Sequence, residues 1–180
     1  MKNNFSQKAK KITESGNKII LDIGCGKVLR GNIGLDFFDG PNVDVVSDLN
    51  STLPIADASC DEVKMFHILE HVKEPLFLLE EVKRILKSGG LVEIRVPHFT
   101  NVTAYQIHHR SYWNSFSLDP ILLEGSKSNE SSKLFSLVSK EINLLYFKKF
   151  QKYITKNKYL YELFLCKIFP AYEVVFILKK

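Results

Sequence analysis

The alternation of apolar and polar positions predicts buried strands separated by loops and helices. Short apolar runs predict strands over residues 18–26, 32–38, 43–49, 61–66 and 91–97, of which the first ends in glycines and the last is stopped by Pro97. Apolar residues recur at helical spacing between 76 and 86, so a helix is expected to start at Pro75 and to end in a glycine cap at 88–90. Such alternation is typical of α/β proteins with a parallel sheet.

The pattern is weaker after residue 98, where a segment rich in aromatic residues and histidine has no clear period. The later residues predict a polar loop at 126–132, a strand within 133–147, an amphipathic helix over 148–169 and a final strand over 172–179. The whole chain therefore predicts a Rossmann-like, mostly parallel seven-stranded sheet with helices on both faces. The first crossover helix is expected to be missing or very short, because CGKVLRGN leaves too few residues for one.

Length and composition place the chain among soluble globular proteins. Its 180 residues suit a single domain, expected over 18–180 after a polar N-terminal extension at 1–17. Apolar residues make up 45% of the chain, and no apolar run is long enough to span a bilayer. The basic N-terminus lacks the apolar core of a signal peptide, and the three cysteines are too widely spaced for a disulfide framework. A reducing, cytoplasmic location is therefore expected.

Positive charge is concentrated in the second half of the chain. Residues 126–180 carry 11 lysines against 4 acidic residues, whereas residues 1–125 carry 14 basic against 16 acidic residues. A solvated helix face is the first interpretation of these lysines, and peripheral contact with an anionic membrane is the alternative. No RNA-binding motif accompanies the charge, so no nucleic acid partner is expected. Nothing in the pattern predicts an oligomeric state.

A glycine-containing loop directly follows the first predicted strand. In LDIGCG, Gly24 and Gly26 let a ligand approach the backbone closely. Asp36 and Asp48 end the second and third predicted strands, at the edge where open α/β sheets bind ligands. Carboxylates there can accept hydrogen bonds from ribose hydroxyls and from an adenine amino group. A nicotinamide site is not expected, because Leu29 stands where a third glycine would be, and no G-K-[ST] phosphate loop is present.

These residues resemble class I S-adenosylmethionine-dependent methyltransferases of the small-molecule branch. The resemblance covers residues 18–98 through LDIGCG, Asp36, Asp48, LPIADASCDEV, HILEHV and LFLLEEVKRILKSGGLVEIRVP. Residues 99–180 match loosely, through the predicted helix and FPAYEVVFILKK, and are similar to methyltransferases of polysaccharide and cell-surface sugar pathways. The resemblance implies a cofactor-binding half at 18–98 and an acceptor-side half at 99–180.

The same resemblance implies S-adenosylmethionine as cofactor and a set of residues that bind it. Asp36 would bind the ribose, Asp48 with Leu49 would bind the adenine, and His67 would border the methyl group. The cofactor loop would contribute Asp22, Gly24, Cys25 and Gly26. The expected reaction is methyl transfer to a small-molecule acceptor with a hydroxyl group, such as a sugar. A catalytically silent module that binds the cofactor and acts on a protein partner is the alternative.

The segment FHILEHV contains His-x-x-Glu-His at 67–71, which is the spacing of a zinc-peptidase motif. His67 directly follows a predicted strand, so it is expected at a strand-to-helix turn and not on one helical face with His71. No metal is therefore expected, and a zinc hydrolase remains a rival interpretation. Glu70 is expected only as an acid in the first turn of a helix.

Histidines near the predicted sheet edge are candidates for a general base, from which a hydroxyl acceptor would benefit near neutral pH. His67 ranks first, His98 after the fifth strand ranks second, and His108 or His109 in the aromatic segment ranks third. A hydrogen bond to a loop or to a helix end is the alternative role of each.

Overall fold

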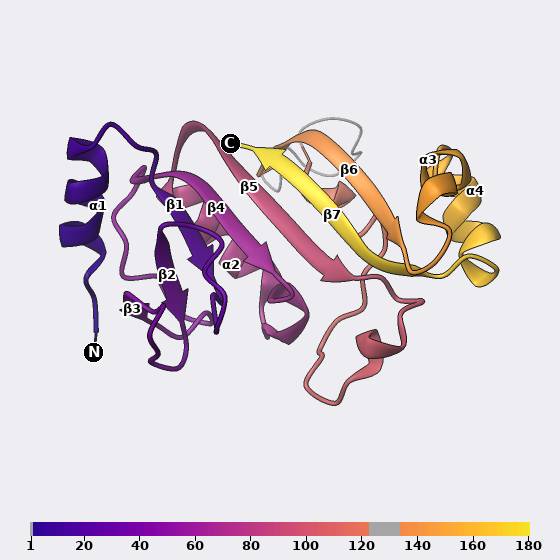
Figure 1. The fold of residues 1–180 in the computed structure, drawn as a ribbon, viewed down its shortest axis with the longest axis horizontal. Coiled ribbons are helices and arrows are strands. Elements are labelled where there is room, and N and C mark those ends of the chain that lie inside the picture. The colour runs from indigo at the N-terminus through magenta and orange to yellow at the C-terminus, as the bar shows by residue number, and fades with distance from the viewer. Residues whose placement is uncertain (1, 123–133) are drawn as a thin grey trace.

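One seven-stranded sheet organises the chain, and the computed structural model describes residues 2–122 and 134–180 of it (Figure 1). The strands are β1 (Ile20–Ile23), β2 (Ile33–Asp36), β3 (Val45–Val46), β4 (Cys60–Phe66), β5 (Leu86–Pro97), β6 (Ser136–Leu144) and β7 (Ala171–Lys179). The α-helices are α1 (Phe5–Glu14), α2 (Pro75–Ile85), α3 (Gln151–Ile154) and α4 (Lys158–Leu163). The polar loop predicted at 126–132 lies outside the described residues.

The strands follow the order β3-β2-β1-β4-β5-β7-β6. The five strands from β3 to β5 pair in parallel, and β7 runs antiparallel between β5 and β6. The Rossmann-like α/β prediction is confirmed, and each predicted strand is found close to its expected residues. The third strand is much shorter than expected, with two residues. The carboxyl ends of β1, β2, β4, β5 and β6 all lie at one edge, which positions the residues of the candidate site.

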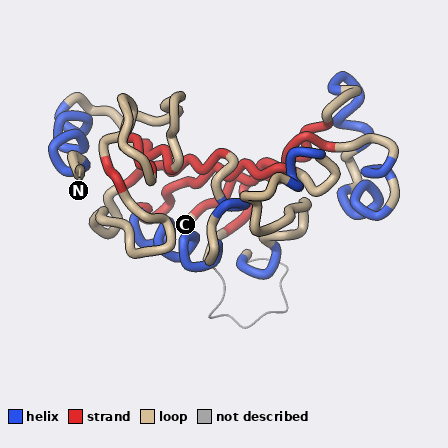
Figure 2. The backbone as a smooth tube through the Cα atoms, turned by 90° about the horizontal axis from the view of Figure 1, so that it is seen from below, coloured by secondary structure: helices blue, strands red, loops and turns tan. Residues whose placement is uncertain are grey.

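Helices cover this sheet less than the sequence predicts. Among the described residues, α2 is the only α-helix that connects two parallel strands, and loops make the crossovers at 24–32, 37–44 and 47–59. In Figures 1 and 2, α2 lies on one side of the sheet, and no helix of the described residues covers the centre of the opposite face. The prediction of helices on both faces is therefore wrong for the crossovers. The short first crossover is as expected.

The open face of the sheet is polar, because side chains alternate along the central strands. In β4, Val63 and Met65 are fully buried on the α2 side, whereas Glu62 and Lys64 are half-buried and lie 3.7 Å apart on the other side. In β5, Arg95 contacts Glu93 at 2.6 Å. A parallel sheet is usually buried on both faces. The charged side chains of β4 and β5 allow the open face of this sheet to contact water.

Helix α2 begins at Pro75, as predicted, but ends earlier than expected. Leu86 follows in extended conformation (φ −69°, ψ 139°) and already pairs with Cys60 as the first residue of β5. The glycine cap predicted at 88–90 is therefore wrong. Gly89 adopts φ +75° at a register shift between β4 and β5, where its N–H donates to the Lys180 carbonyl. A glycine accepts this left-handed conformation without steric cost.

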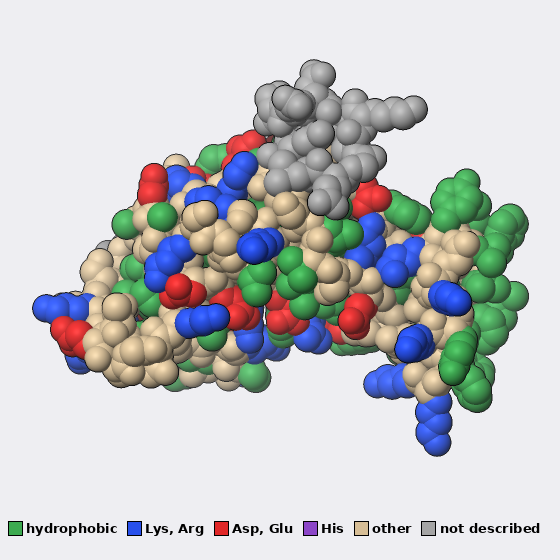
Figure 3. Space-filling view, turned by 90° about the horizontal axis from the view of Figure 1, so that it is seen from above, with side chains coloured by type: hydrophobic (Ala, Val, Ile, Leu, Met, Phe, Trp, Pro, Cys, Tyr) green, Lys and Arg blue, Asp and Glu red, His purple; other side chains and the backbone are tan. Residues whose placement is uncertain are grey.

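The amphipathic helix predicted over 148–169 is also wrong as a single helix. The segment forms two short helices, α3 and α4, flanked by single turns of 3₁₀-helix. Asn157 causes the break, because its side chain accepts a hydrogen bond from the Leu160 N–H and starts a new helix there. The short helices leave many apolar side chains exposed, and Figure 3 shows them gathered at the α3–α4 end of the molecule.

The N-terminal segment, expected only as a polar extension, contains α1. Phe5 is buried in the core, and Ala9 and Ile12 are partly buried and pack against the same core. The N–H of Asn4 donates to the Asp44 carbonyl, which fixes the segment beside β3. No helix in the described part of the chain is long and apolar enough to cross a membrane.

An ion-pair network from α2 holds the long helix-free crossover before β4. Glu81 is almost fully buried, and its Oε2 accepts a hydrogen bond of 2.8 Å from the Leu53 N–H. Arg84 donates to Glu81, to the carbonyls of Leu53 and Ile55, and to Asp57. The hydrogen bonds from Arg84 are the main reason that the pKa of Glu81 lies below its usual value. The network therefore takes the place of a crossover helix.

Replacing Glu81 by glutamine is expected to lower the free energy of unfolding at pH 7 by about 1–3 kcal/mol, because a charge-assisted network is lost. The folded-state pKa of Glu81 is lowered, so its contribution is fully present above the unfolded-state pKa and is lost as the pH falls through the lower folded-state pKa. Urea unfolding at pH 7 and pH 3 measures the difference. Glu80→Gln at the exposed neighbouring position is the control, and an equal deficit of Glu81→Gln at both pH values would contradict the prediction.

Candidate functional site

A cavity of about 620 Å³ opens at the carboxyl edge of the parallel strands. Four residues that the sequence predicts for the cofactor line it, namely Gly24, Asp36, Asp48 and Leu49. The rest of its wall consists of Phe37, Phe38, Asn50, Ile68, His71, Val72, Lys73 and His108. The cavity has the size and the mixed apolar and polar lining of a small-molecule site.

The glycine loop forms the floor of this cavity and depends on two left-handed residues. Gly24 has φ +72°, and a Cβ atom placed on it would lie 1.9 Å from Cδ1 of Ile68. The group that approaches Gly24 most closely is therefore a side chain of the protein, whereas the sequence predicts a ligand there. Gly26 has φ +51° and open space around it. It is exposed and does not line the cavity.

Asp36 connects the end of β2 to the glycine loop. Its Oδ2 accepts a hydrogen bond of 2.9 Å from the Gly26 N–H, and its Oδ1 accepts one of 3.2 Å from the Phe38 N–H. An ionised carboxylate has about four acceptor positions, so Asp36 can also bind two hydroxyl groups in the cavity. Phe37 and Phe38 follow it as an exposed edge-to-face pair with ring centroids 4.9 Å apart.

Asp48 follows β3 and is held ionised at the cavity wall. Its Oδ1 accepts hydrogen bonds from the backbone N–H and the side-chain amide of Asn50, at 2.9 and 2.8 Å. The bond from the Asn50 backbone is the first cause of its lowered pKa. Leu49 lies beside it on the same wall. The pair offers one acceptor next to an apolar surface.

Asp22 and Cys25 lie under the loop and outside the cavity. Asp22 is fully buried, and its Oδ2 accepts a hydrogen bond of 2.7 Å from the Arg30 N–H. Burial raises the pKa of this carboxyl group, and its Oδ1 has no partner. Burial also raises the pKa of Cys25 to about 11, so its thiol stays protonated at neutral pH. Both residues fasten the loop, and neither lines the cavity that their predicted cofactor role would require.

His67 occupies the strained turn after β4. It has φ +57°, a left-handed conformation that is rare outside glycine. Its Nε2 lies 3.2 Å from Glu173 Oε2, and its Nδ1 lies 3.5 Å from Glu70 Oε1. Hydrogen bonds to Glu173 and Glu70 raise the pKa of His67 to about 9, so the ring is protonated at neutral pH. A ring with both nitrogens engaged accepts no proton, which argues against the predicted role of base.

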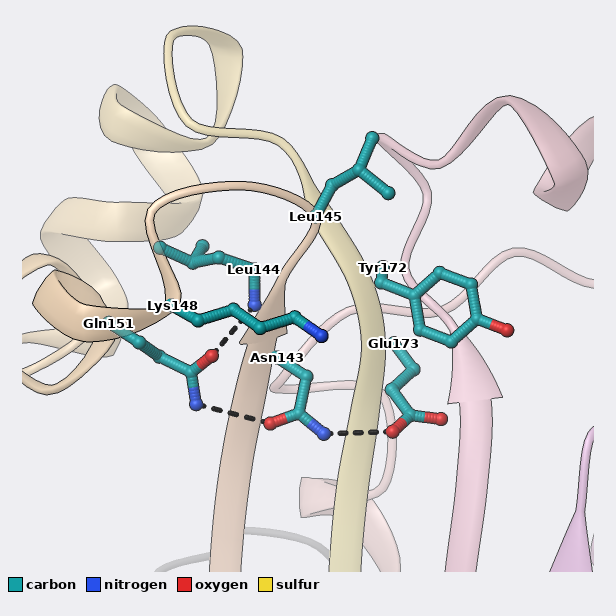
Figure 4. A pocket seen from close by; sticks show the side chains of 7 residues that line it. All are labelled: Asn143, Leu144, Leu145, Lys148, Gln151, Tyr172 and Glu173. Atoms are coloured by element: carbon teal, nitrogen blue, oxygen red, sulfur yellow. Dashed lines mark hydrogen bonds between the residues drawn. The ribbon is translucent and has the colours of Figure 1, made fainter.

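Glu173 also lines a second cavity, of about 540 Å³, at the carboxyl end of β6. In Figure 4, hydrogen bonds join Gln151, Asn143 and Glu173 in a row, with the Nζ atom of Lys148 extended above them. Tyr172 adds an aromatic ring to the lining. Through Glu173, His67 is therefore connected to this cavity, and through its neighbour Ile68 it is connected to the first one.

The other predicted bases differ in accessibility. His98 is fully buried, with Nδ1 2.7 Å from Thr100 Oγ1 and Nε2 3.0 Å from Glu162 Oε2. These contacts tie the end of β5 to α4 and favour a structural role. His109 is half-buried, and its Nδ1 lies 3.0 Å from the carbonyl oxygen of Ala104. His108 is exposed and lines the first cavity.

The sequence did not predict the second cavity or several residues of the first. Phe37 and Phe38 carry a usable signal, because an aromatic pair directly follows a strand-end acid. Glu173 carries another, because it is an acid inside an otherwise apolar final strand. Lys148 and Gln151 carry none, since only the fold of the 148–169 segment brings them to Asn143.

Residues 34–94 match a family model described as a methyltransferase domain. A probable S-adenosylmethionine-dependent methyltransferase of Mycolicibacterium smegmatis is 30% identical over an alignment of 97 positions, which covers 44% of this chain and 38% of that protein. A protein of the same description from Mycobacterium tuberculosis strain H37Rv is 28% identical over 97 residues, or 35% of its length. The chain thus spans well under half the length of the curated relatives it matches.

Solved structures resemble the whole chain. A crystal structure of a SAM-dependent methyltransferase from Archaeoglobus fulgidus gives a TM-score of 0.62 at 20% identity and covers 97% of this chain and 94% of its own. The [4+2]-cyclase SpnF gives a TM-score of 0.58 at 16% identity and covers 96% and 79%. At these identities the likeness concerns the fold. The chain therefore shares the Rossmann-like fold of these solved structures, and residues 34–94 match the model of a methyltransferase domain.

Proposed function

We propose that this protein transfers a methyl group from S-adenosylmethionine to a small hydroxylated acceptor, such as a sugar-containing metabolite. One observation carries the proposal: Gly24, Asp36 and Asp48 lie at or just after the carboxyl ends of β1, β2 and β3 and line one cavity. The methyltransferase-domain match at 34–94 includes both acids. The two carboxylates lie where a nucleoside would need acceptors.

Within this proposal, the chain's own residues fit the cofactor in the first cavity. Asp36 accepts hydrogen bonds from the two ribose hydroxyls, while Asp48 accepts one from the adenine amino group beside Leu49. Gly24 lines the same cavity, next to the side chain of Ile68. The bound cofactor supplies an activated methyl group on a sulfonium, which leaves as a neutral thioether when the acceptor oxygen takes the methyl.

Replacing Asp36 by alanine is expected to weaken S-adenosylhomocysteine binding by about 1.5–3 kcal/mol, because charge-assisted hydrogen bonds to the ribose are lost. Calorimetric titration measures the change. Asp39→Ala is the matched control, since Asp39 is an exposed carboxylate that bonds Lys2 at 2.9 Å outside the cavity. Equal affinity of the Asp36 variant and the wild type would remove Asp36 from the site. Thermal melting of both variants shows whether the loop itself has unfolded.

The second cavity suits a hydroxylated acceptor. Its polar side chains are an acid, two amides and an ammonium group, which together donate and accept several hydrogen bonds, and Tyr172 offers an aromatic face. His67 lies between the two cavities with both ring nitrogens bonded to carboxylates, so we assign it a positioning role. Methyl transfer of this kind depends mainly on the alignment of acceptor oxygen and methyl carbon. The acceptor hydroxyl proton leaves to solvent.

Lys148→Ala is expected to raise the KM for the acceptor about tenfold with little change in S-adenosylhomocysteine affinity, because Lys148 lines only the second cavity. Release of S-adenosylhomocysteine during turnover measures the rate. Lys149→Ala is the control, since this neighbouring lysine is exposed outside the cavity. An unchanged KM in the Lys148 variant would place the acceptor elsewhere.

A silent cofactor-binding module remains the rival from another class. A fold hosts more than one chemistry, and one structure of this fold is described as a cyclase. A screen of hydroxylated acceptors separates the two functions. Turnover supports the enzyme, whereas saturable S-adenosylhomocysteine binding without turnover on any acceptor supports the module.

We also propose that the 147–168 surface contacts an anionic membrane. Its exposed apolar side chains include Tyr153 at 77% and Ile168 at 67% exposure, and six lysines lie in the same segment. Aromatic and aliphatic side chains next to lysines are typical of segments that bind a lipid interface. An apolar surface of this kind rarely stays unpartnered.

Phe164→Ser is expected to reduce co-sedimentation with vesicles that contain phosphatidylglycerol about tenfold, because an exposed aromatic ring no longer enters the interface. Phe38→Ser is the control, because Phe38 is an even more exposed aromatic residue (74%, against 62% for Phe164) in the loop after β2, near the edge of the sheet opposite β6. Binding should also weaken in high salt and be absent from purely zwitterionic vesicles. Equal loss in both variants, or no vesicle binding at all, would contradict the proposal.

A further inference from the structure

Three potential metal ligands meet at the rim of the first cavity. Glu70 and His71 lie on a single 3₁₀ turn after β4, and His109 comes from the loop that follows β5. One ligand atom from each residue lies within 4.8 Å of the other two. The rings of His71 and His109 are 4.6 Å apart in an edge-to-face arrangement. Segments almost 40 positions apart in the sequence therefore converge here.

The carboxylate of Glu70 supplies a second, independent observation. The residue is 1% exposed, and its Oε2 is buried without a hydrogen-bond partner. A buried carboxylate oxygen that has lost water and gained no partner carries a substantial free-energy cost. The contact of Glu70 Oε1 with His67 at 3.5 Å leaves this second oxygen unsatisfied. A cation at the cluster would satisfy it.

His109 is already oriented as a ligand. Its Nδ1 lies 3.0 Å from the Ala104 carbonyl oxygen, which can only accept, so Nδ1 carries the proton and Nε2 carries the lone pair. Metal-binding histidines commonly donate their second ring N–H to a carbonyl in this way. Nearby, the Arg110 N–H donates to the Glu70 carbonyl at 2.6 Å and holds the two segments together. His71 is exposed and can turn toward the cluster.

We propose that Glu70, His71 and His109 bind a divalent transition metal of the zinc class. Two imidazole nitrogens and one carboxylate oxygen suit Zn²⁺, whereas Mg²⁺ prefers oxygen ligands. Ligand bonds of about 2.0–2.1 Å in a tetrahedron place ligand atoms roughly 3.3 Å apart. The present separations of up to 4.8 Å need to close by about 1.5 Å at most.

The proposed metal ligands differ from those that the zinc-peptidase motif His-x-x-Glu-His would supply. His67 is not a ligand, because its ring bonds Glu173 and Glu70 on the other side of the turn. His109 takes its place from a distant segment. Since His71 also lines the first cavity, a bound ion would fix the turn and the loop at 106–110 as one wall of that cavity. This role is independent of the proposed methyl transfer.

Zinc titration of the tag-free, chelator-stripped protein tests the site, with calorimetry for affinity and elemental analysis for stoichiometry. One zinc ion per chain is expected, and at least a tenfold loss of affinity in His109→Ala and in His71→Ala. His108→Ala is the matched control, because this adjacent exposed histidine lies outside the cluster. Cobalt substitution should give visible absorption bands in the wild type and the control but not in His109→Ala.

Three results would overturn the proposal: no stoichiometric zinc, unchanged zinc affinity in the His109 variant, or an equal loss in the His108 control. S-adenosylhomocysteine titration of the same zinc-free protein keeps the two proposals separate. Cofactor binding without zinc binding would remove the metal site alone, and zinc binding without cofactor binding would remove the proposed function alone.

Discussion

Carboxylates that accept hydrogen bonds from backbone N–H groups hold this fold together. Loops make three of the crossovers between parallel strands, so their backbone groups have no helix to satisfy them. Asp22 binds the Arg30 N–H of the first crossover at 2.7 Å, Asp44 ties the end of the second crossover to the Gly34 N–H of β2 at 2.9 Å, and Asp61 of β4 binds the Ile19 N–H just before β1 at 2.8 Å. Glu81 does the same for the Leu53 N–H. The strands can therefore stay parallel although the usual helices are missing.

This arrangement couples the candidate site to the fold. Asp36 fastens the glycine loop through Gly26 and also faces the cavity. A ligand that hydrogen-bonds to the Asp36 carboxylate therefore contacts the same group that fixes the position of the glycine loop. Asp48 is in the same situation, because it orders the turn at Asn50 while it faces the cavity. Ligand binding should thus stabilise the crossovers themselves, more than in a protein where helices fix them.

The sequence predicts the strands and their terminal acids well, because both depend on short-range patterns. A strand such as 61–66 is recognisable from period-two alternation, and Asp36 and Asp48 take their places from the strands that they end. Helix ends were harder to predict. Leu86 leaves α2 to pair with Cys60, and the side chain of Asn157 breaks the segment that apolar spacing predicts as one helix. These outcomes depend on partners distant in the sequence or on one capping bond.

The same reason decides which site residues the sequence predicts correctly: local patterns are recognised, and contacts between distant segments are not. Asp22 and Cys25 belong to the glycine motif, but their burial beneath the loop depends on how the short crossover folds back over β2. The second cavity depends on the pairing of β6 with β7, which brings Asn143 to Glu173 at 2.8 Å. No local pattern encodes that contact.

The backbone conformation of one residue explains why the two histidines of His-x-x-Glu-His lie in two different environments. His67 takes φ +57°, so its side chain leaves the turn toward β7 and bonds Glu173. His71 ends the 3₁₀ turn at Leu69–His71, and its ring lies against that of His109. On a regular helix the two histidines, four residues apart, would share one face.

The strained turn therefore divides the motif, with Glu70 buried between the two histidines and one of its carboxylate oxygens available to each. His67 then belongs to the path between the two cavities, and His71 to the wall of the first. A motif match alone assigns both histidines to one metal, whereas the proposed metal site keeps only His71 and replaces His67 by His109 from another segment.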